Sequence, residues 1–329
     1  MIGCGDVTEV KSAPAFNQVP GSRLVAVMAR TPERVRDYAR RHGVPHWYTD
    51  AERLVNDPEV NAVYIATPPS SHAQYAILAA QAGKAVYVEK PMAHTVADCR
   101  RMIAACRRAG VPLYVAYYRR YQERFLQVKQ WLREGRIGEV RLVNVDLWLP
   151  PRPEDLPPDN LPWRVRPEIS GGGYFHDMAS HQLDLLDDWF GPLTEARGET
   201  HNRAGWYPAP DVVLARFRLP DGGLGQGSWC FCASQPVDRI EIVGSRGLIR
   251  VAAFLPAPVE LVTPEGIEQR NLIPAQPVAK PLIERVVRAL RGMGDCSTTG
   301  ETALRTNEVM EAICGPPATD RHAAGPADG

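Results

Sequence analysis

The run MIGCGDVT at residues 1–8 decides how the first part of the chain folds. Two glycines separated by one residue allow a strand to turn sharply into a helix, and they let a ligand approach the backbone closely. The helix that follows has free backbone N–H groups at its start, which attract a phosphate. The run therefore predicts a dinucleotide-binding turn made by Gly3, Gly5, Asp6 and Val7.

Strands and helices alternate from this turn to about residue 118. Apolar runs without interruption are expected of strands that are buried on both faces of a parallel sheet. Amphipathic or small-residue segments follow three of these runs, and each ends at a glycine. The runs lie at residues 24–28, 62–66, 85–88 and 113–117, and the helical segments lie at 32–42, 72–82 and 95–109. This order predicts a doubly wound parallel sheet.

The pattern changes after residue 120. A helix over about 121–134 precedes a long strand at 139–149 in which apolar and polar residues alternate, and a loop with six prolines follows. Later strands are joined by short Gly-rich turns, which is typical of antiparallel hairpins. We therefore predict an α/β domain over residues 1–118 and an α+β domain with a mainly antiparallel open sheet over 119–314. Residues 315–329 are expected to form a disordered tail.

Composition narrows the classes of protein. The chain has 329 residues with 38 basic and 38 acidic side chains, which argues against nucleic-acid binding through bulk charge. No apolar run is long enough for a membrane helix, and the start does not read as a secretory signal. Seven scattered cysteines without a CxxC pair are expected to be buried thiols in a reducing cytoplasm. The cysteines predict no zinc site, because no further ligands stand at suitable spacing to them.

The residues after the second strand bear on the choice of cofactor. An enzyme that binds NAD usually places an acid at this point for the ribose hydroxyls. Here the strand ends in Arg30 and Thr31, with Arg34 one turn later. An arginine beside a hydroxyl suits a 2′-phosphate, so the sequence favours NADP over NAD. The alternative is that Arg30 is a solvated side chain at a helix start.

Two loops follow strands at the edge where an open α/β sheet binds ligands. The first contains Thr67 and Pro68 and leads to His72, and the second contains Glu89 and Lys90. We expect both loops to contact the cofactor. Lys90 can donate to a substrate hydroxyl, and a nearby nicotinamide cation would favour loss of its proton. The alternatives are an ordinary βα loop and a surface Lys-Pro turn.

The run GGGYFHDMASHQLD at residues 171–184 is the most informative of the second domain. Asp177, His181 and Asp184 are spaced i, i+4 and i+7, so they are predicted to share one helix face. An acid beside an imidazole suits proton transfer at a carbinol. Two alternatives stay open, namely a metal site with further ligands and a capping role for Asp177.

These segments together resemble the Gfo/Idh/MocA family of NAD(P)-dependent oxidoreductases. The resemblance also covers YRR at 118–120 and WR at 163–164, and it spans about residues 3–312. It implies a Rossmann domain followed by a domain whose open sheet forms a homodimer or homotetramer. It implies that Lys90 lies at the nicotinamide and the substrate, and that His181 is the acid/base with Asp177 beside it. The residues implied to lie near the substrate are Tyr118, Arg120, Trp163 and Arg164.

Two departures from the family pattern concern the first turn. Thr8 replaces a residue that is usually small, and only Met1 and Ile2 precede the turn where members usually carry five or six apolar residues. Because those residues form the central strand of the sheet, a chain that starts at Met1 is expected to have lower stability or weaker cofactor binding.

The resemblance implies hydride transfer between nicotinamide and a carbinol or carbonyl of a sugar, a polyol or a cyclic diol. The partner is then a small molecule, with neither nucleic acid nor membrane involved. Two other classes remain open at this point. One is a dinucleotide-binding regulator without turnover, and the other is a glycoside hydrolase that retains NAD and oxidises its substrate transiently.

Overall fold

The computed structural model describes residues 1–315, so the predicted tail lies outside the described part except for Gly315. The chain forms two compact units, each described here by itself. The first unit contains Met1–Gln122 and Ala275–Leu304, and the second contains Glu123–Pro274 with the residues that follow Leu304. This division places residues 119–122 and 275–304 in the first unit, whereas the sequence analysis assigned them to the second domain.

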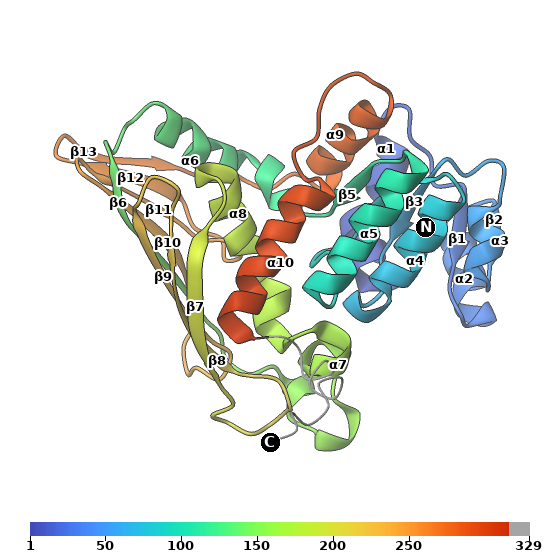
Figure 1. The fold of residues 1–329 in the computed structure, drawn as a ribbon, viewed down its shortest axis with the longest axis horizontal. Coiled ribbons are helices and arrows are strands. Elements are labelled where there is room, and N and C mark those ends of the chain that lie inside the picture. Colours follow the sequence, from blue (N-terminus) through green and yellow to red (C-terminus); the bar gives the residue numbers. More distant parts are fainter. Residues whose placement is uncertain (316–329) are drawn as a thin grey trace, which may run out of the picture. The chain divides into compact units, whose positions relative to one another are not determined.

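The first unit contains a parallel sheet with helices on both faces (Figure 1). Its strands are β1 (Ala26–Met28), β2 (His46–Tyr48), β3 (Ala62–Ile65), β4 (Ala85–Val88) and β5 (Leu113–Val115). Its helices are α1 (Ala13–Gln18), α2 (Pro32–His42), α3 (Ala51–Val55), α4 (His72–Gln81), α5 (Val96–Ala109) and α9 (Lys280–Leu290). The predicted doubly wound domain is confirmed, and most predicted elements match within a few residues.

Ile2 joins the two parts of this sheet. It forms parallel bridges to Met28 of β1 and to Ile65 of β3, and it is fully buried. The Ile2 amide donates to the carbonyl of Tyr64, and the Ala66 amide donates to the carbonyl of Ile2, both over 2.8 Å. The sheet order is therefore β2-β1-Ile2-β3-β4-β5, with one residue in the position of a central strand.

A cavity of about 660 Å³ lies beside this residue. Met1 lines it together with the amino-terminal parts of β1 and β3, and the rings of Phe16, Tyr64 and Tyr87 also contribute. Ala62 is exposed although it belongs to an inner strand. The bridges of Ile2 to β1 and β3 are thus made at Met28 and Ile65, the carboxyl-terminal ends of these strands, which is the edge that carries the predicted ligand loops.

Successive residues of the inner strands point to opposite faces, as the pleat requires. Val63 and Ile65 belong to an apolar cluster with α3, α4 and α5. Tyr64 belongs to a second cluster with α2 and α9. Burial on both faces explains why these strands are continuously apolar.

Local signals set the ends of two of these helices. Gly43 ends α2 and Gly110 ends α5, each in the left-handed conformation with φ of 64° and 67°. Thr95 caps α5, because its hydroxyl accepts from the Asp98 amide. Thr31 stands at the N-cap of α2, and its side chain makes no capping hydrogen bond.

The second unit contains an eight-stranded sheet in the order β13-β12-β11-β10-β6-β9-β8-β7. All neighbours are antiparallel except the parallel pair β6 and β9, so the predicted mainly antiparallel open sheet is confirmed. The strands are β6 (Val140–Trp148), β7 (Thr194–His201), β8 (Val212–Arg218), β9 (Leu224–Cys230), β10 (Val237–Gly244), β11 (Leu248–Val251), β12 (Val259–Thr263) and β13 (Gly266–Arg270). The helices are α6 (Glu123–Arg133), α7 (Pro167–Ser170) and α8 (Ser180–Phe190), and α10 (Gly300–Cys314) crosses the division between the units.

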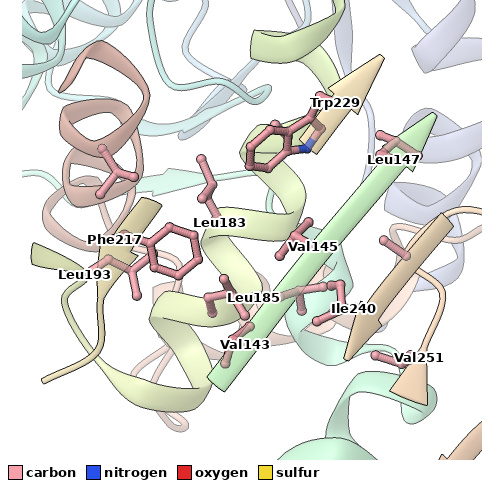
Figure 2. Close-up of a cluster of buried hydrophobic side chains, with 14 of the residues drawn as sticks. Val143, Val145, Leu147, Leu183, Leu185, Leu193, Phe217, Trp229, Ile240 and Val251 are labelled. Atoms are coloured by element: carbon pink, nitrogen blue, oxygen red, sulfur yellow. The ribbon is translucent and has the colours of Figure 1, made fainter. Parts of the chain in front are cut away.

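Helix α8 packs on the inner face of this sheet. Val143, Val145 and Leu147 of β6 alternate with polar residues and are fully buried. Figure 2 shows them in one cluster with Leu183 and Leu185 of α8. The Trp229 indole of β9 also donates to Gln182 Oε1 over 2.8 Å, so α8 is held by both apolar packing and a buried hydrogen bond. The helix that carries His181 is thereby fixed on the sheet.

Candidate functional site

The glycine turn of the first unit packs tightly against the next loop. Gly3 has φ of +101°, and a Cβ at this position would lie 2.6 Å from the carbonyl oxygen of Ala66. Only glycine fits such a contact in this conformation. At Gly5 a Cβ would meet no atom within 4 Å, so the backbone there is open to a ligand. Gly3 therefore allows close packing against Ala66, whereas Gly5 leaves its backbone accessible to a ligand.

Thr8 is accommodated by a contact within the turn itself. Its side chain is fully buried, and its hydroxyl donates to the carbonyl of Gly5 over 2.6 Å. The backbone is helical from Asp6 and takes a π-turn over Thr8–Ser12 before α1. The helix start at Asp6 and Val7 therefore directs its free N–H groups toward the turn, which suits a pyrophosphate.

The predicted 2′-phosphate residues lie at the carboxyl end of β1. Arg30 and Thr31 follow the strand and are exposed. Arg34 donates through Nε to the carbonyl of Cys4 over 3.0 Å, so it ties α2 to the glycine turn. The segment offers cationic and hydroxyl groups to a ligand, and no acidic residue stands between Met28 and Pro32.

Lys90 follows β4, next to a buried acid. Glu89 is buried, and its Oε1 accepts a hydrogen bond from the Tyr64 hydroxyl, which also lies 3.0 Å from Ser12 Oγ. Burial raises the pKa of Glu89, while the Tyr64 hydrogen bond and the Lys90 charge oppose that rise. Glu89 is thus held in the interior of the unit by Tyr64, and its predicted cofactor contact stays a prediction.

The loop after β3 contains Thr67 and Pro68, and it ends at His72. The Ser71 hydroxyl donates to Thr67 Oγ1 over 2.8 Å and lies 3.0 Å from the Pro68 carbonyl, which fixes the loop locally. His72 is the first residue of α4 and is fully buried. Its ring contacts backbone carbonyls of both loops, so the structure brings together the segments around Gly3, Thr67 and Lys90.

Tyr118 and Arg120 lie on a 3-10 turn just after β5 in the same unit. Both are buried, and the Arg119 guanidinium lies over the Tyr118 ring, 5.4 Å from its centroid. Their predicted substrate contacts stay a prediction.

The remaining predicted residues lie in the second unit, around the start of α8. Asp177 lies in a π-turn over Phe175–Ala179, and His181 lies in the first turn of α8. His181 is 3% exposed and packs edge-to-face on Phe254, with 6.1 Å between ring centroids. A π-turn adds a residue to one helical turn, and such turns are frequent at functional sites. The predicted regular helix over this stretch is therefore wrong in detail, because the sequence does not signal the extra residue.

Arg164 is paired with Asp177. Its Nε lies 3.3 Å from Asp177 Oδ2, and its guanidinium stacks over the Trp163 ring at 4.7 Å. Arg164 therefore contacts both Trp163 and Asp177, which the sequence analysis also expected near the substrate. Among residues 1–315, no group of three or more His, Cys, Asp or Glu side chains could hold a metal ion.

The glycines at 171–173 serve packing more than flexibility. A Cβ on Gly172 would lie 2.1 Å from His176 Nδ1, and a Cβ on Gly173 would lie 2.5 Å from the Ala209 side chain. The run thus lets the buried His176 ring and the chain at Ala209 lie against the backbone. The sequence analysis missed this role of His176, although three successive glycines signal a close approach.

A buried acid that the sequence analysis also missed holds the proline-rich loop. Asp155 is fully buried, and its two oxygens accept from the Tyr174 hydroxyl over 2.8 and 2.9 Å. The Arg152 guanidinium lies over the Tyr174 ring at 4.7 Å. This cluster ties the loop to the turn that leads into Asp177. No local motif predicts it, because the partners are 19 residues apart.

Comparisons with known proteins agree with this arrangement. Residues 1–117 match the model of the oxidoreductase family with an NAD-binding Rossmann fold (GFO_IDH_MocA), and residues 125–250 match the GFO/IDH/MocA C-terminal domain. The chain is 37% identical to Oxidoreductase P35 of Formosa agariphila over 317 residues, which are 96% of this chain and 97% of the relative. The chain belongs to the Gfo/Idh/MocA family of NAD-binding oxidoreductases.

Two further members show the range of the family. The chain is 30% identical to a 1,5-anhydro-D-fructose reductase of Ensifer adhaerens, with 86% of this chain and 85% of the relative covered. The WlbA dehydrogenase of Bordetella pertussis, solved with NADH and UDP-GlcNAcA, is 28% identical. It superposes with a TM-score of 0.80 over 95% of this chain and 93% of that chain. The family and the oxidoreductase class expected from the sequence are confirmed. No helix in the described part of the chain is both long and apolar enough to cross a membrane.

The two glycines of the turn should respond differently to alanine. Gly3→Ala meets both the Ala66 carbonyl and an unfavourable φ, so the free energy of unfolding should fall by about 1–3 kcal/mol or more. Gly5→Ala should change that free energy by less than about 0.5 kcal/mol, since its Cβ meets no protein atom. Dinucleotide affinity should nevertheless fall in Gly5→Ala. Thermal unfolding and fluorescence titration measure the two effects. A strong loss of stability in Gly5→Ala would contradict the assignment.

The Asp155–Tyr174 pair should give a pH-dependent loss of stability. Burial raises the pKa of Asp155 and the Tyr174 hydrogen bond opposes this, so Tyr174→Phe should raise that pKa further. A carboxyl whose pKa is higher in the folded than in the unfolded state lowers the free energy of unfolding as the pH rises above the unfolded pKa. Tyr174→Phe should therefore cost about 1–3 kcal/mol at pH 7 and less at pH 4, measured by urea unfolding. Tyr207→Phe is the control, because that buried hydroxyl has no hydrogen-bond partner among the described residues. An equal loss at both pH values would exclude this account.

Proposed function

We propose that this oxidoreductase transfers hydride between a nicotinamide dinucleotide and a carbinol or carbonyl of a sugar, a polyol or a cyclic diol. The observation that carries the proposal is the convergence of Gly3, the Thr67 loop and the Lys90 loop at one edge of the parallel sheet. The named activities of the relatives support the substrate class, since one reduces 1,5-anhydro-D-fructose and one was solved with a nucleotide sugar.

The residues of the first unit fit a dinucleotide. The open backbone at Gly5 and the helix start at Asp6 suit the pyrophosphate. Arg30, Thr31 and Arg34 suit the adenosine ribose and its 2′-phosphate, and Thr67 and Pro68 suit the nicotinamide half. When it is bound, the nicotinamide ring accepts or delivers the hydride.

We assign the proton and the developing charge of the reaction to Lys90, Asp177 and His181. In the oxidation direction the carbinol C–H bond breaks with its electron pair, which leaves as hydride. The hydroxyl proton passes to His181, and the C–O bond becomes a carbonyl. Lys90 donates a hydrogen bond to the reacting oxygen and stabilises its developing negative charge. Asp177, held by Arg164, orients His181 or relays its proton. The reduction runs through the same groups in reverse.

We also propose a cytoplasmic homodimer or homotetramer. The outward residues of β6 and β8 include Trp148, which is 38% exposed, and Leu214, which is 51% exposed. Apolar side chains on an open sheet face support association with a second copy. All seven cysteines are free thiols, which supports a reducing compartment.

Two substitutions test the catalytic roles. In a panel of sugars, polyols and cyclic diols with NADP⁺ or NAD⁺, Lys90→Ala and His181→Ala should each lower kcat/KM by about 100-fold or more, because each removes a group that acts on the reacting oxygen. Dinucleotide affinity should change little in His181→Ala. His201→Ala, on the exposed strand β7, is the matched control. Wild-type activity in both variants would remove these roles, and dinucleotide binding with no turnover of any substrate would support the regulator alternative.

The NADP preference is tested at Arg30. Arg30→Ala removes a cation that pairs with a 2′-phosphate and should lower the ratio of NADP to NAD affinity by about tenfold. Arg36→Ala is the control, because Arg36 lies on α2, the helix that follows Arg30, and its guanidinium lies over the Trp47 ring at 5.1 Å. Calorimetric titration with both dinucleotides gives the ratio. An unchanged ratio in Arg30→Ala means that the preference has another origin.

A further inference from the structure

His72 lies between the two loops that carry the predicted cofactor contacts. Its Nε2 is 2.7 Å from the carbonyl oxygen of Thr67. Its Nδ1 is 3.1 Å from the carbonyl oxygen of Pro91 and 3.2 Å from that of Met92. The side chain is fully buried. A ligand therefore cannot reach this ring directly, and both ring nitrogens are engaged with backbone.

The surroundings of the ring consist of acceptors on both sides. Carbonyl oxygens accept hydrogen bonds and cannot donate, so each ring nitrogen must supply an N–H to make its contact. Burial lowers the pKa of His72, and the Lys90 charge acts in the same direction, whereas the three carbonyls oppose both. A neutral ring has one N–H, which can serve either the Thr67 carbonyl or the Pro91 and Met92 carbonyls. The imidazolium would hold both loops with full hydrogen bonds.

The contacts of His72 extend to the other parts of the site. The Thr67 peptide is the surface on which Gly3 packs, since a Cβ on Gly3 would lie 3.2 Å from the Thr67 amide nitrogen. The Pro91 carbonyl belongs to the residue that directly follows Lys90. A shift of the ring would therefore move the backbone beside Lys90 relative to the glycine turn.

We propose that His72 is a positioning residue, which fixes the Lys90–Met92 backbone to the Thr67 loop and so sets Lys90 at the nicotinamide without contacting the cofactor. The inference rests on the proposed function. It replaces the expectation that His72 itself binds the cofactor. A misplacement of about 1 Å in a reacting geometry can cost about 100-fold in rate, so a residue remote from the reaction has a large effect by this route.

Three substitutions distinguish the contact of Nε2 with Thr67 from the contact of Nδ1 with Pro91 and Met92. His72→Leu removes both ring nitrogens and keeps an apolar side chain in the buried position. In His72→Asn the amide nitrogen can occupy the place of Nδ1 and restore the contact to Pro91 and Met92. In His72→Gln the amide nitrogen can occupy the place of Nε2 and restore the contact to Thr67. Val35→Ala is the stability control, because Val35 is a fully buried residue of α2 that belongs to neither loop.

We expect His72→Leu to lower kcat by about tenfold or more, to weaken dinucleotide binding, and to change the KM of the substrate by less than about threefold. His72→Asn should regain most of kcat, and His72→Gln should regain dinucleotide affinity. Hydrogen exchange of the peptides that span 66–72 and 88–94 should speed up in His72→Leu and stay unchanged in Val35→Ala at a similar loss of Tm.

A purely structural role would give other results. The proposal is wrong if His72→Leu and Val35→Ala have the same kcat, dinucleotide affinity and exchange at equal Tm. If the wild type turns over no substrate, the proposed function fails, but exchange and dinucleotide affinity still decide the role of His72. Faster exchange with unchanged affinity and unchanged kcat would also overturn the proposal.

Discussion

The pairing of Ile2 with β1 and β3 is the contact on which the first unit depends. Hydrogen bonds from this one residue reach the Tyr64 and Ala66 backbone, and its neighbours Met1 and Gly3 pair with Met28. Because Gly3 follows directly, the same pairing places the glycine turn against Ala66 and Thr67. The ligand edge of the sheet is thus defined by a very short segment. Strand pairing is short here, and side-chain hydrogen bonds from neighbouring elements also stabilise the turn. One example is the bond from Arg34 of α2 to the Cys4 carbonyl.

The second unit relies on a different kind of support. Helix α8 is fixed by the apolar cluster on β6 and by the buried bond between Trp229 and Gln182. The segment before it is less regular, since glycines and a π-turn let His176 and Asp177 approach their neighbours. Asp155 and Tyr174 hold this irregular segment to the proline-rich loop. A rigid helix thereby follows a turn of unusual geometry, which suits a site whose polar side chains must be placed accurately.

Periodic and local features of the fold could be predicted from the sequence. The apolar run at 85–88 and the Thr95 cap of α5 follow directly from burial and hydrogen-bonding rules. The return of residues 275–304 to the first unit could not be predicted, because no local pattern says which sheet a late helix joins. The π-turn before His181 could not be predicted either, because no periodicity or propensity signals one extra residue in a helical turn. The hydrogen bond between Asp155 and Tyr174 could not be predicted, because it joins residues on either side of a long loop.

Two buried histidines show why residue type alone does not assign a role. His72 is surrounded by carbonyl oxygens of its own unit, so its nitrogens are occupied in holding backbone. His181 follows a π-turn that carries an Asp–Arg pair, and its ring packs on Phe254. Both are similarly buried, and both occupy the first turn of a helix. What separates them is the chemistry of the surrounding segments, because backbone carbonyls meet both nitrogens of His72, whereas the π-turn before His181 carries the Asp177–Arg164 pair. A sequence motif identifies a histidine, but its possible role depends on the groups that surround its ring in the folded protein.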